Sequence, residues 1–503
     1  MTSMRTTILH GLAWTGAGQV LHQVLRLGVG IALARLLSPA EFGLIAMVVM
    51  LTGFAEMFLE IGLGAALVQR AQIDETHRST VFVVTLAAGA ALAGLFVLIA
   101  PAIAQFFGRA ELDALTCVLA VNFIIAGLRC VPLALLTRAL RFRAIATIEI
   151  IAALTAGCAA IVAAARGWGL WALALHLLLN SAILTILHGA AAGWRPRERP
   201  RVAALRQVLG FGAGVLGFRV TDYWSMRIDH LLVGRFIGPA SLGVYGKAYE
   251  LVLFPVRQIG AVVTRVMFPA LSSIGDDPAR IKRIYLRAVG LIGLVAFPCA
   301  LGMGAAAESL VLVTLGEPWR EMIPLVQILC LVAASSTIVT TTSWLYMARG
   351  RADLMFRWGL GAGLIKTLAI VIGLRWGLPG VAISLVVANY AVLLHPSLAI
   401  PGRLVGLRVA EILRETAAPF LGALAMAAFV FLLGRALPLD PASPARLGIQ
   451  VAAGAAVYAA LMHALSPGPY RELRQLLREP LGRLRSHLSS GNRAVALTRS
   501  RAS

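Results

Sequence analysis

The sequence predicts an all-α polytopic membrane protein of about fourteen transmembrane helices. Three observations lead to this fold class: an apolar composition, long apolar runs, and a phrase that occurs twice. Of the 503 residues, 59% are hydrophobic and only 14% are charged, which excludes an ordinary soluble globular domain. Runs such as 81–100 and 419–434 are long enough, with their flanks, to cross a hydrocarbon core of about 30 Å as helices. Helices are the expected form because they satisfy every backbone polar group within one segment.

Turn residues and charges divide the chain into fourteen apolar segments. Their ranges, in chain order, are 7–34, 40–68, 80–106, 112–137, 144–165, 169–192, 207–237, 240–270, 285–312, 321–348, 354–375, 379–401, 412–435 and 446–466. The first segment follows Arg5 without a convincing cleavage site, so we expect it to be a retained helix and not a signal peptide.

Lys and Arg are distributed unevenly between the two sets of loops that connect these segments. If both termini are cytoplasmic, twenty-nine of the 45 basic residues lie inside and only eight lie outside. This bias predicts cytoplasmic termini. It also accounts for the net charge of +22 by basic loops that face anionic lipid, so nucleic acid is not an expected partner.

The repeated phrase is RLLSPAEFGL at 35–44 and RFIGPASLGV at 235–244. In the first copy Ser38 is an N-cap, Pro39 suits the first helical position and Glu41 completes a capping box. The second copy has Gly238 at the cap and keeps Pro239. Each copy is expected to be an outer turn between the first two helices of a six-helix block. The chain should therefore form two parallel six-helix lobes, related by a pseudo-two-fold axis along the membrane normal, plus two C-terminal helices.

Charged residues within the apolar segments indicate a functional site. Eleven of fifteen belong to segments 1, 2, 7 and 8, which the repeat makes equivalent in pairs. Each charge near the centre of a membrane helix costs about 2.5–3.5 kcal/mol, so these side chains must face protein or water. Their helical spacing forms polar stripes, which predicts one shared hydrophilic cavity. The candidate substrate-cavity residues are Gln19, His22, Arg26, Arg219, Tyr223, Arg227, Lys247 and Arg257. The candidate ion-coupling residues are Glu56, Glu60, Asp222, Asp229 and Glu250.

The alternative for any single one of these residues is an ion pair that only assembles the helices. We expect that structural role for the four charges outside the cluster, Arg129, Glu149, Glu308 and Lys366. The five cysteines lie in apolar segments without CxxC spacing, and the nine histidines are scattered. We therefore expect no disulfide, no metal site and no cofactor, and we assign no catalytic residue.

Five stretches of the chain resemble the polysaccharide-transport family of bacterial lipid-linked oligosaccharide flippases. That family belongs to the multidrug, oligosaccharidyl-lipid and polysaccharide exporter superfamily. The stretches are RLLSPAEFGLIA (35–46), LTRALRFRAIA (136–146), RIDHLLVGRFIGPASLGVYGKAYEL (227–251), VMFPALSSI (266–274) and MARGRADLMFRW (347–358). The resemblance covers residues 5–465. It implies a non-enzymatic protein of the bacterial inner membrane that moves polyprenyl-diphosphate-linked oligosaccharide, such as an exopolysaccharide, capsule or O-antigen repeat unit, to the outer leaflet by alternating access.

The resemblance also implies cavity arginines that accommodate the anionic headgroup, a role that passes to Arg26, Arg219, Arg227 and Arg257 by location only. Two alternatives remain. A drug or cation exporter of the same superfamily is opposed by the cavity arginines and the closer motif match. A membrane glycan polymerase or ligase is opposed by the short outer loops. Contacts with a polymerase or glycosyltransferase are possible, and a monomer is the default.

The predicted organisation has five parts. They are the N-lobe at 1–192, a basic cytoplasmic linker at 193–206 that forms a hinge or a surface helix, the C-lobe at 207–402, two further helices within 403–469, and a basic cytoplasmic tail at 470–503, partly disordered.

Overall fold

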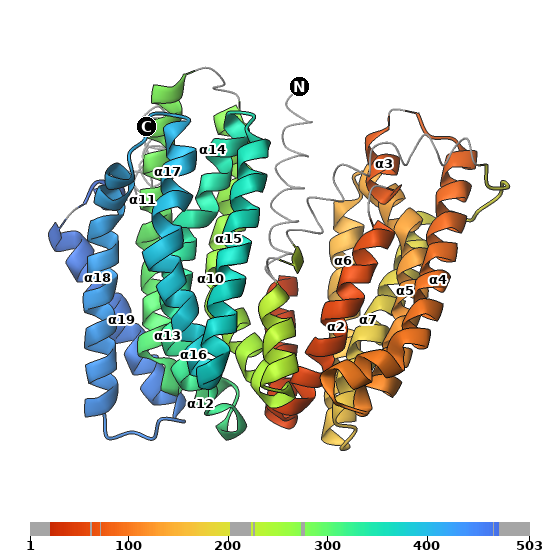
Figure 1. Ribbon diagram of the computed structural model, residues 1–503, viewed down its shortest axis with the longest axis horizontal. Helices are drawn as coiled ribbons and strands as arrows, with labels where there is room; N and C mark the ends of the chain where they lie inside the picture. The colour runs from red at the N-terminus through yellow and green to blue at the C-terminus, as the bar shows by residue number, and fades with distance from the viewer. Residues whose placement is uncertain are drawn as a thin grey trace, which may run out of the picture. The chain divides into compact units, whose positions relative to one another are not determined.

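The computed structural model describes residues 21–60, 63–70, 72–201, 223–224, 227–272, 277–465 and 467–471. Within these ranges every regular element is a helix (Figure 1). Ten stretches of this part of the chain are long and apolar enough to span a membrane, and one of them, Ala352–Arg403, covers two predicted segments. Helical residues 21–36 and 227–236 and helix α10 match the remaining predicted segments. The prediction of an all-helical polytopic protein with about fourteen spans is therefore confirmed.

The chain divides into two compact units. Unit 1 comprises Met1–Ala248, Thr314–Met322 and Gly359–Ser384, and unit 2 comprises Tyr249–Val313, Ile323–Trp358 and Leu385–Ser503. The helices wholly in unit 1 are residues 21–36, α2 (Pro39–Glu60), α3 (Leu63–Gln69), α4 (Glu75–Phe107), α5 (Glu111–Arg138), α6 (Phe142–Ala165), α7 (Leu170–Ala192), residues 227–236, and the short 3-10 helices η1 (Glu317–Trp319) and η3 (Leu374–Trp376).

Three helices contribute several residues to each unit: α10 (Pro239–Ser272), α15 (Ala352–Gly373) and α16 (Gly377–Val387). Two helices lie in unit 2 except for one terminal residue: α12 (Ala307–Thr314), whose last residue belongs to unit 1, and α13 (Met322–Val339), whose first residue does. The helices wholly in unit 2 are α11 (Pro278–Ala305), η2 (Thr340–Thr342), α14 (Ser343–Ala348), the π-helical η4 (Ala388–Leu393), α17 (Leu394–Arg403), α18 (Val409–Ala436) and α19 (Pro444–Leu465).

Two helices begin several residues before the apolar segments that predicted them. Asp74 caps α4 by accepting a hydrogen bond from the His77 backbone N–H at 2.8 Å, and Asp277 caps α11 by accepting one from the Arg280 backbone N–H at 3.0 Å. The bond from His77 also holds the pKa of the Asp74 carboxyl below its ordinary value. Each cap begins the helix with a polar first turn. Hydropathy alone does not predict this turn, so the predicted segments begin too late.

The core of unit 1 is built from the faces of its membrane helices. At one end, Leu33 and Leu37 pack on small residues of α6 and α7, including Ala160 and Ala172. At the other end, Leu67 of α3 packs on Val81 of α4 and Val131 of α5. These two clusters pack the first helix against α6 and α7, and α3 against α4 and α5.

Unit 2 contains an ion pair between a buried arginine and a partly exposed glutamate. Arg446 of α19 is 7% exposed, lies 3.3 Å from the Glu308 carboxylate of α12, and also donates to the Gly434 carbonyl oxygen at 2.8 Å. The prediction that Glu308 is an interhelical partner is thus confirmed.

Candidate functional site

The turn before α2 contains the predicted capping box. The Ser38 backbone N–H donates to Glu41 Oε2 at 2.7 Å, and the Glu41 backbone N–H donates to Ser38 Oγ at 3.4 Å. Pro39 and Pro239 begin α2 and α10, as predicted. Gly238, which replaces Ser38 in the second copy, has a φ of 116°, a conformation that residues with a side chain rarely adopt. The two turns therefore start equivalent helices by different capping chemistry.

The two copies of the phrase pack against each other. A Cβ atom on Gly43 would lie 1.8 Å from the Pro239 carbonyl oxygen, and a Cβ atom on Gly243 would lie 1.9 Å from the Pro39 carbonyl oxygen. The contact is reciprocal, as expected around a two-fold axis. Since any side chain would overlap backbone atoms, the glycine common to both copies allows α2 and α10 to cross this closely. We call this contact the glycine crossing.

Lys247 of α10 lies between the first helix and α2. Its Nζ atom is 4.9 Å from the centroid of the Phe42 ring, within the range of a cation–π contact. A Cβ atom on Gly30 would lie 3.8 Å from the same Nζ atom. Lys247 therefore brings a positive charge to the face of the first helix that carries Gly30.

Arg26 lies on that same face of the first helix. Residues 22, 26 and 30 are spaced by four, so His22 and Arg26 line up with Gly30, and Arg26 is about 6 Å from Gly30 along the helix axis. The Arg26 side chain is exposed, and no described residue pairs with its guanidinium group. Arg26 and Lys247 thus place two cationic groups along one side of the first helix.

Tyr223 joins the seventh helix to α2. Its hydroxyl donates to the Met50 carbonyl oxygen at 2.6 Å, and the Phe54 ring lies 5.8 Å from the Tyr223 ring and 5.1 Å from the Trp224 ring, centroid to centroid. The guanidinium carbon of Arg227, an exposed side chain, is 5.8 Å from the Tyr223 ring centroid. Aromatic contacts with α2 thus support a third cationic group.

Asp229 is a buried carboxylate, 7% exposed, between the seventh helix and α10. His230 Nδ1 lies 2.8 Å from Asp229 Oδ1, and the Tyr245 hydroxyl donates to Asp229 Oδ2 at 3.0 Å. On the other side of the imidazole ring, a Cβ atom on Gly246 would lie 3.6 Å from His230 Nε2. The carboxylate and the imidazole form a pair able to hold a proton within the membrane.

The other predicted carboxylates differ in their surroundings. Glu56 accepts a hydrogen bond from the Asn122 amide of α5, and Glu250 is exposed on α10. The remaining candidates lie outside the described residues, either entirely (Gln19, Arg219 and Asp222) or in their side chains (Glu60 and Arg257). The described parts of the first, second, seventh and eighth helices are therefore in contact through named side chains.

Sequence reasoning missed the polar partners of the carboxylates, Tyr245 and Asn122. Both are polar residues within apolar segments, the same signal that identified Asp229. The sequence does not show which polar residues of an apolar segment face a carboxylate, because the two partners are 16 and 66 residues apart. The Tyr245 hydroxyl and the Asn122 amide satisfy the buried Asp229 and the half-buried Glu56.

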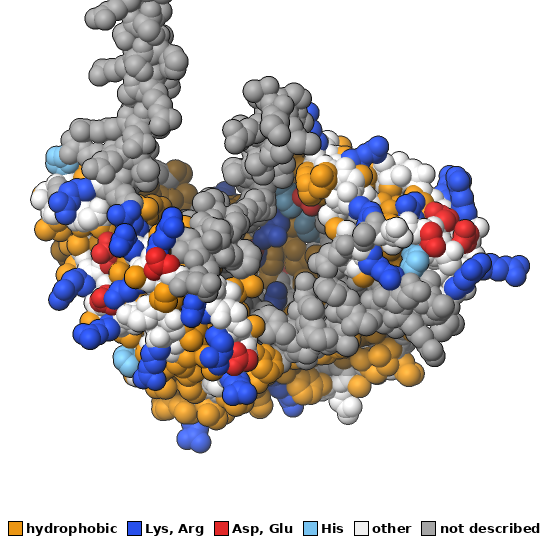
Figure 2. Space-filling view, turned by 90° about the horizontal axis from the view of Figure 1, so that it is seen from above, with side chains coloured by type: hydrophobic (Ala, Val, Ile, Leu, Met, Phe, Trp, Pro, Cys, Tyr) orange, Lys and Arg blue, Asp and Glu red, His pale blue; other side chains and the backbone are white. Residues whose placement is uncertain are grey.

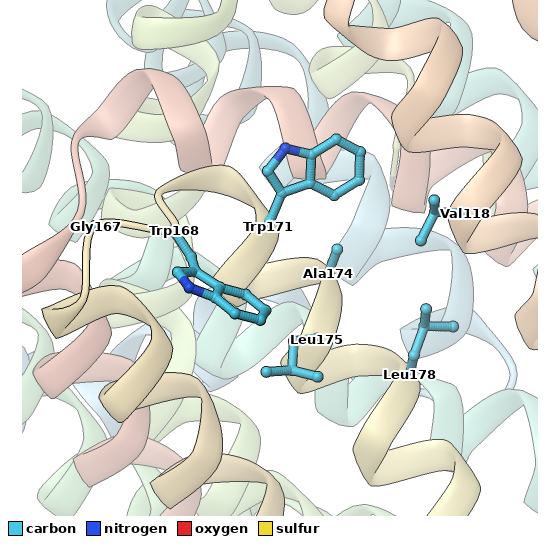
Figure 3. Close-up of a pocket in the computed structure, with 7 residues that line it drawn as sticks. All are labelled: Val118, Gly167, Trp168, Trp171, Ala174, Leu175 and Leu178. Atoms are coloured by element: carbon cyan, nitrogen blue, oxygen red, sulfur yellow. The ribbon is translucent and has the colours of Figure 1, made fainter.

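A separate apolar groove of about 550 Å³ lies on unit 1, away from these charges (Figure 3). Trp168 and Trp171 lie beside it, 54% and 41% exposed, at the start of α7. Exposed tryptophans are typical of the membrane–water interface. They therefore mark the depth at which α7 leaves the bilayer.

The fold defines the class of protein. The structure is similar to the lipid II flippase MurJ in an inward closed conformation, with a TM-score of 0.74, 15% sequence identity, and coverage of 91% of this chain and 99% of that one. It is also similar to an inward-facing multidrug resistance MATE family transporter of the MOP superfamily, with a TM-score of 0.59, 17% identity, and coverage of 76% of this chain and 95% of that one. The predicted fold class, a two-lobed helical membrane protein, is confirmed.

The chain belongs to the polysaccharide biosynthesis protein family, whose model matches residues 32–324. It is 30% identical over 473 residues to the teichuronic acid biosynthesis protein TuaB of Bacillus subtilis, covering 92% of this chain and 96% of that protein. It is 27% identical to the lipopolysaccharide biosynthesis protein WzxC of Escherichia coli, covering 74% of this chain and 76% of that protein. The predicted resemblance is confirmed.

Proposed function

We propose that this protein is a flippase that moves lipid-linked oligosaccharide, carried on a polyprenyl diphosphate, from the inner to the outer leaflet of the bacterial cytoplasmic membrane. The observation that carries the proposal is the 30% identity, over nearly the whole chain, to a protein of teichuronic acid biosynthesis. The similarity of the fold to a lipid II flippase supports it. The reaction is transport, in which no bond of the glycan is made or broken.

The diphosphate is the part of such a substrate that most resists crossing the membrane, because its charges lose their hydration. Arg26, Arg227 and Lys247 present cationic groups from three neighbouring helices. A guanidinium group offers a planar fork of donors that matches phosphate oxygens, so Arg26 and Arg227 are assigned to the headgroup. His22 and Tyr223 supply further polar groups beside them. Gln19, Arg219 and Arg257 are assigned to the same cavity by their sequence positions.

The glycine crossing closes the outer end of this site. In the proposed cycle the two lobes, 1–192 and 207–402, rock about the cavity, and α2 must separate from α10 before the headgroup leaves to the outer leaflet. The close backbone contact at Gly43 and Gly243 supports this assignment. The two helices touch here without a covalent link across the contact. They can therefore separate while each helix stays intact.

Ion coupling is assigned to the acidic residues of the cavity. Asp229 with His230 is the best supported site, because its carboxylate is buried and already holds a polar partner on each oxygen. Movement of such a pair between dry and wet surroundings would change its proton occupancy. Glu56, Glu60, Asp222 and Glu250 complete the proposed set.

The charge bias of the loops supports cytoplasmic positions for both termini. This orientation places the substrate-loading side at the end where enzymes assemble the glycan. We expect the protein to transport its substrate as a monomer. Its expected neighbours are glycosyltransferases on the cytoplasmic side and polymerases on the other side.

Depletion of the protein in its own cells tests the proposed function. We expect surface polysaccharide to fall and lipid-linked oligosaccharide to accumulate in the cytoplasmic leaflet, with drug susceptibility unchanged. Restoration by the wild-type chain is the control. Increased drug susceptibility with normal surface polysaccharide would instead identify a drug exporter. Loss of chain elongation without accumulation of the lipid-linked unit in the inner leaflet would identify a polymerase.

A further inference from the structure

A second charged pocket lies in unit 1, and its lining residues belong to none of the first, second, seventh and eighth helices. It has a volume of about 640 Å³ and lies where α4 begins, α5 and α7 end, and the segment 193–201 follows α7. This is the end of unit 1 that carries α3, and Figure 2 looks onto that face, where Lys and Arg side chains gather. We call it the basic pocket.

Positive charge dominates the basic pocket. Its charged lining residues are five arginines and one glutamate: Arg78, Arg138, Arg141, Arg195, Arg197 and Glu75. The carboxyl ends of α5 and α7 contribute about −0.5 of a charge each, and the amino end of α4 about +0.5. These dipoles offset only a small part of the four excess positive charges.

Only some of the guanidinium donors of these arginines form hydrogen bonds with carbonyl oxygens at helix ends. Arg138 donates to the carbonyl oxygens of Leu67 at 3.0 Å and of Arg70 at 2.5 Å, so it is committed to the end of α3. Arg141 makes one bond to the Ala191 carbonyl oxygen at 3.2 Å, which leaves donors available on its guanidinium group. Arg78 is partly committed, because its Nη1 atom lies 3.7 Å from Glu75 Oε2, while its buried Nε atom has no hydrogen-bond partner among the described residues. The pocket therefore has donor capacity that the protein does not use.

The wall that carries Arg195 and Arg197 is held in place by α4. Trp194 Nε1 donates to the Glu75 carboxylate at 2.9 Å, the Arg197 backbone N–H donates to Ser79 Oγ at 3.2 Å, and the Arg201 backbone N–H donates to Thr80 Oγ1 at 3.0 Å. Ser79 and Thr80 are buried, at 0% and 2% exposure. This segment is thus a fixed wall, and a preformed wall lowers the entropy lost when a ligand binds.

The remaining lining is apolar, from Leu135, Leu136 and Trp194. A ligand that satisfies the pocket must carry negative charge for the arginines and apolar groups for the half-buried Leu135 and Trp194, since Leu136 is only 1% exposed. Basic pockets between helix ends on the cytoplasmic side suit lipid phosphate groups for this reason. A soluble anion would satisfy the arginines but would leave the apolar wall uncovered.

We propose that the basic pocket binds the phosphate headgroup of an anionic phospholipid of the inner leaflet. The guanidinium groups of Arg78, Arg141, Arg195 and Arg197 receive the phosphate, and Trp194 with Leu135 covers the glycerol and the first carbons of the chains. The site is distinct from the proposed substrate cavity, so the phospholipid does not compete with the glycan lipid.

Binding of short-chain phosphatidylglycerol to the purified full-length protein in neutral detergent tests the proposal. Its affinity is measured by native mass spectrometry against phosphatidylcholine of the same chain length. The variant is Arg195→Gln with Arg197→Gln. The matched control is Arg199→Gln with Arg201→Gln, which removes the same charge from the same segment outside the pocket lining.

We expect the wild type and the control to prefer phosphatidylglycerol, and the Arg195/Arg197 variant to bind it about tenfold more weakly or worse. Equal weakening in both double variants, or no preference over phosphatidylcholine, would overturn the proposal. Inorganic phosphate that displaces phosphatidylglycerol at millimolar concentration would also overturn it, by assigning the pocket to a soluble anion. Because the readout is phospholipid binding, it is independent of whether glycan flipping is the protein's function.

Discussion

Gly43 and Gly243 show what a single missing side chain does in this protein. Each lies against the first carbonyl group of the other's helix, at a separation that no Cβ atom tolerates. In a membrane, where helices gain little from burying apolar surface against one another, close backbone approach is a main source of packing energy. These two glycines therefore set the closest approach of α2 and α10.

Substitution of either glycine should weaken the crossing. Gly43→Ala or Gly243→Ala is expected to lower the melting temperature of the detergent-purified protein, with a cost at or above the ~1–3 kcal/mol typical of overpacking. Gly28→Ala is the matched control, because a Cβ atom on Gly28 has nothing within 4 Å. Melting temperatures equal to that of the control would show that the crossing does not pack as described.

Residue-level features were predictable from the sequence where the physics is local. The capping box of Ser38 and Glu41 followed from a three-residue spacing, and the intramembrane charges followed from the cost of exposing them to lipid. The packing of Gly43 on Pro239 was not predictable, because nearly two hundred residues separate them and no local spacing records the contact. The repeat indicated equivalence of the two turns, but not that they touch.

The segment 194–201 is the element whose form differs most from expectation. Its basic, proline-bearing composition suggested a hinge or a surface helix, whereas the structure has no helix in these residues and ties them to the first turns of α4. The signal was present in Ser79 and Thr80, two polar residues next to an apolar run. The sequence does not show that their hydroxyl groups accept hydrogen bonds from backbone N–H groups of the linker, because this contact forms only in the folded protein.

Loss of one of these acceptors should loosen the linker. Ser79→Ala removes the hydroxyl that accepts the backbone N–H groups of Arg197 and Glu198, at about 1 kcal/mol for each bond. Trypsin should then cleave after Arg197 and Arg201, the linker arginines that no proline follows, up to about thirty times faster, as local opening becomes more frequent.

The control for this experiment is Thr155→Ala. The Thr155 hydroxyl bonds only within its own helix, to the Ile151 carbonyl oxygen at 2.7 Å and the Ala152 carbonyl oxygen at 3.3 Å. Equal cleavage rates in the Ser79 and Thr155 variants would contradict the claim that the Ser79 hydroxyl holds the segment 194–201 against α4.

Helix positions were predicted well because the membrane leaves an apolar run few alternatives to a helix. Local breaks within the runs were not predicted. The segment 285–312 contains the junction of α11 and α12 at Ala306, and the segment 379–401 contains the π-helical turn Ala388–Leu393. Glu308 lies beside the first break, and Asn389 and Pro396 lie in and after the second, but such residues also occur within unbroken helices, such as Pro101 in α4, so composition alone does not locate the breaks.

At the scale of the whole molecule, the account joins a two-lobed membrane fold to a cluster of cationic groups. The fold and the family rest on similarity along most of the chain. The assignment of headgroup binding to Arg26 and Arg227 rests on their exposure and their positions on neighbouring helices. This assignment is the central claim, because the fold alone is shared with drug transporters.

The most direct test is lipid flipping in reconstituted vesicles. A labelled polyprenyl-diphosphate oligosaccharide is followed by its accessibility from outside, for the wild type, for Arg26→Gln with Arg227→Gln, and for Arg166→Gln, an exposed outer residue, as the control. Since a hydrogen bond to a charged group contributes about 1.5–3 kcal/mol, the double variant should flip at least about tenfold more slowly, while the control matches the wild type. Equal rates for the double variant and the wild type would contradict the placement of the diphosphate in this cavity.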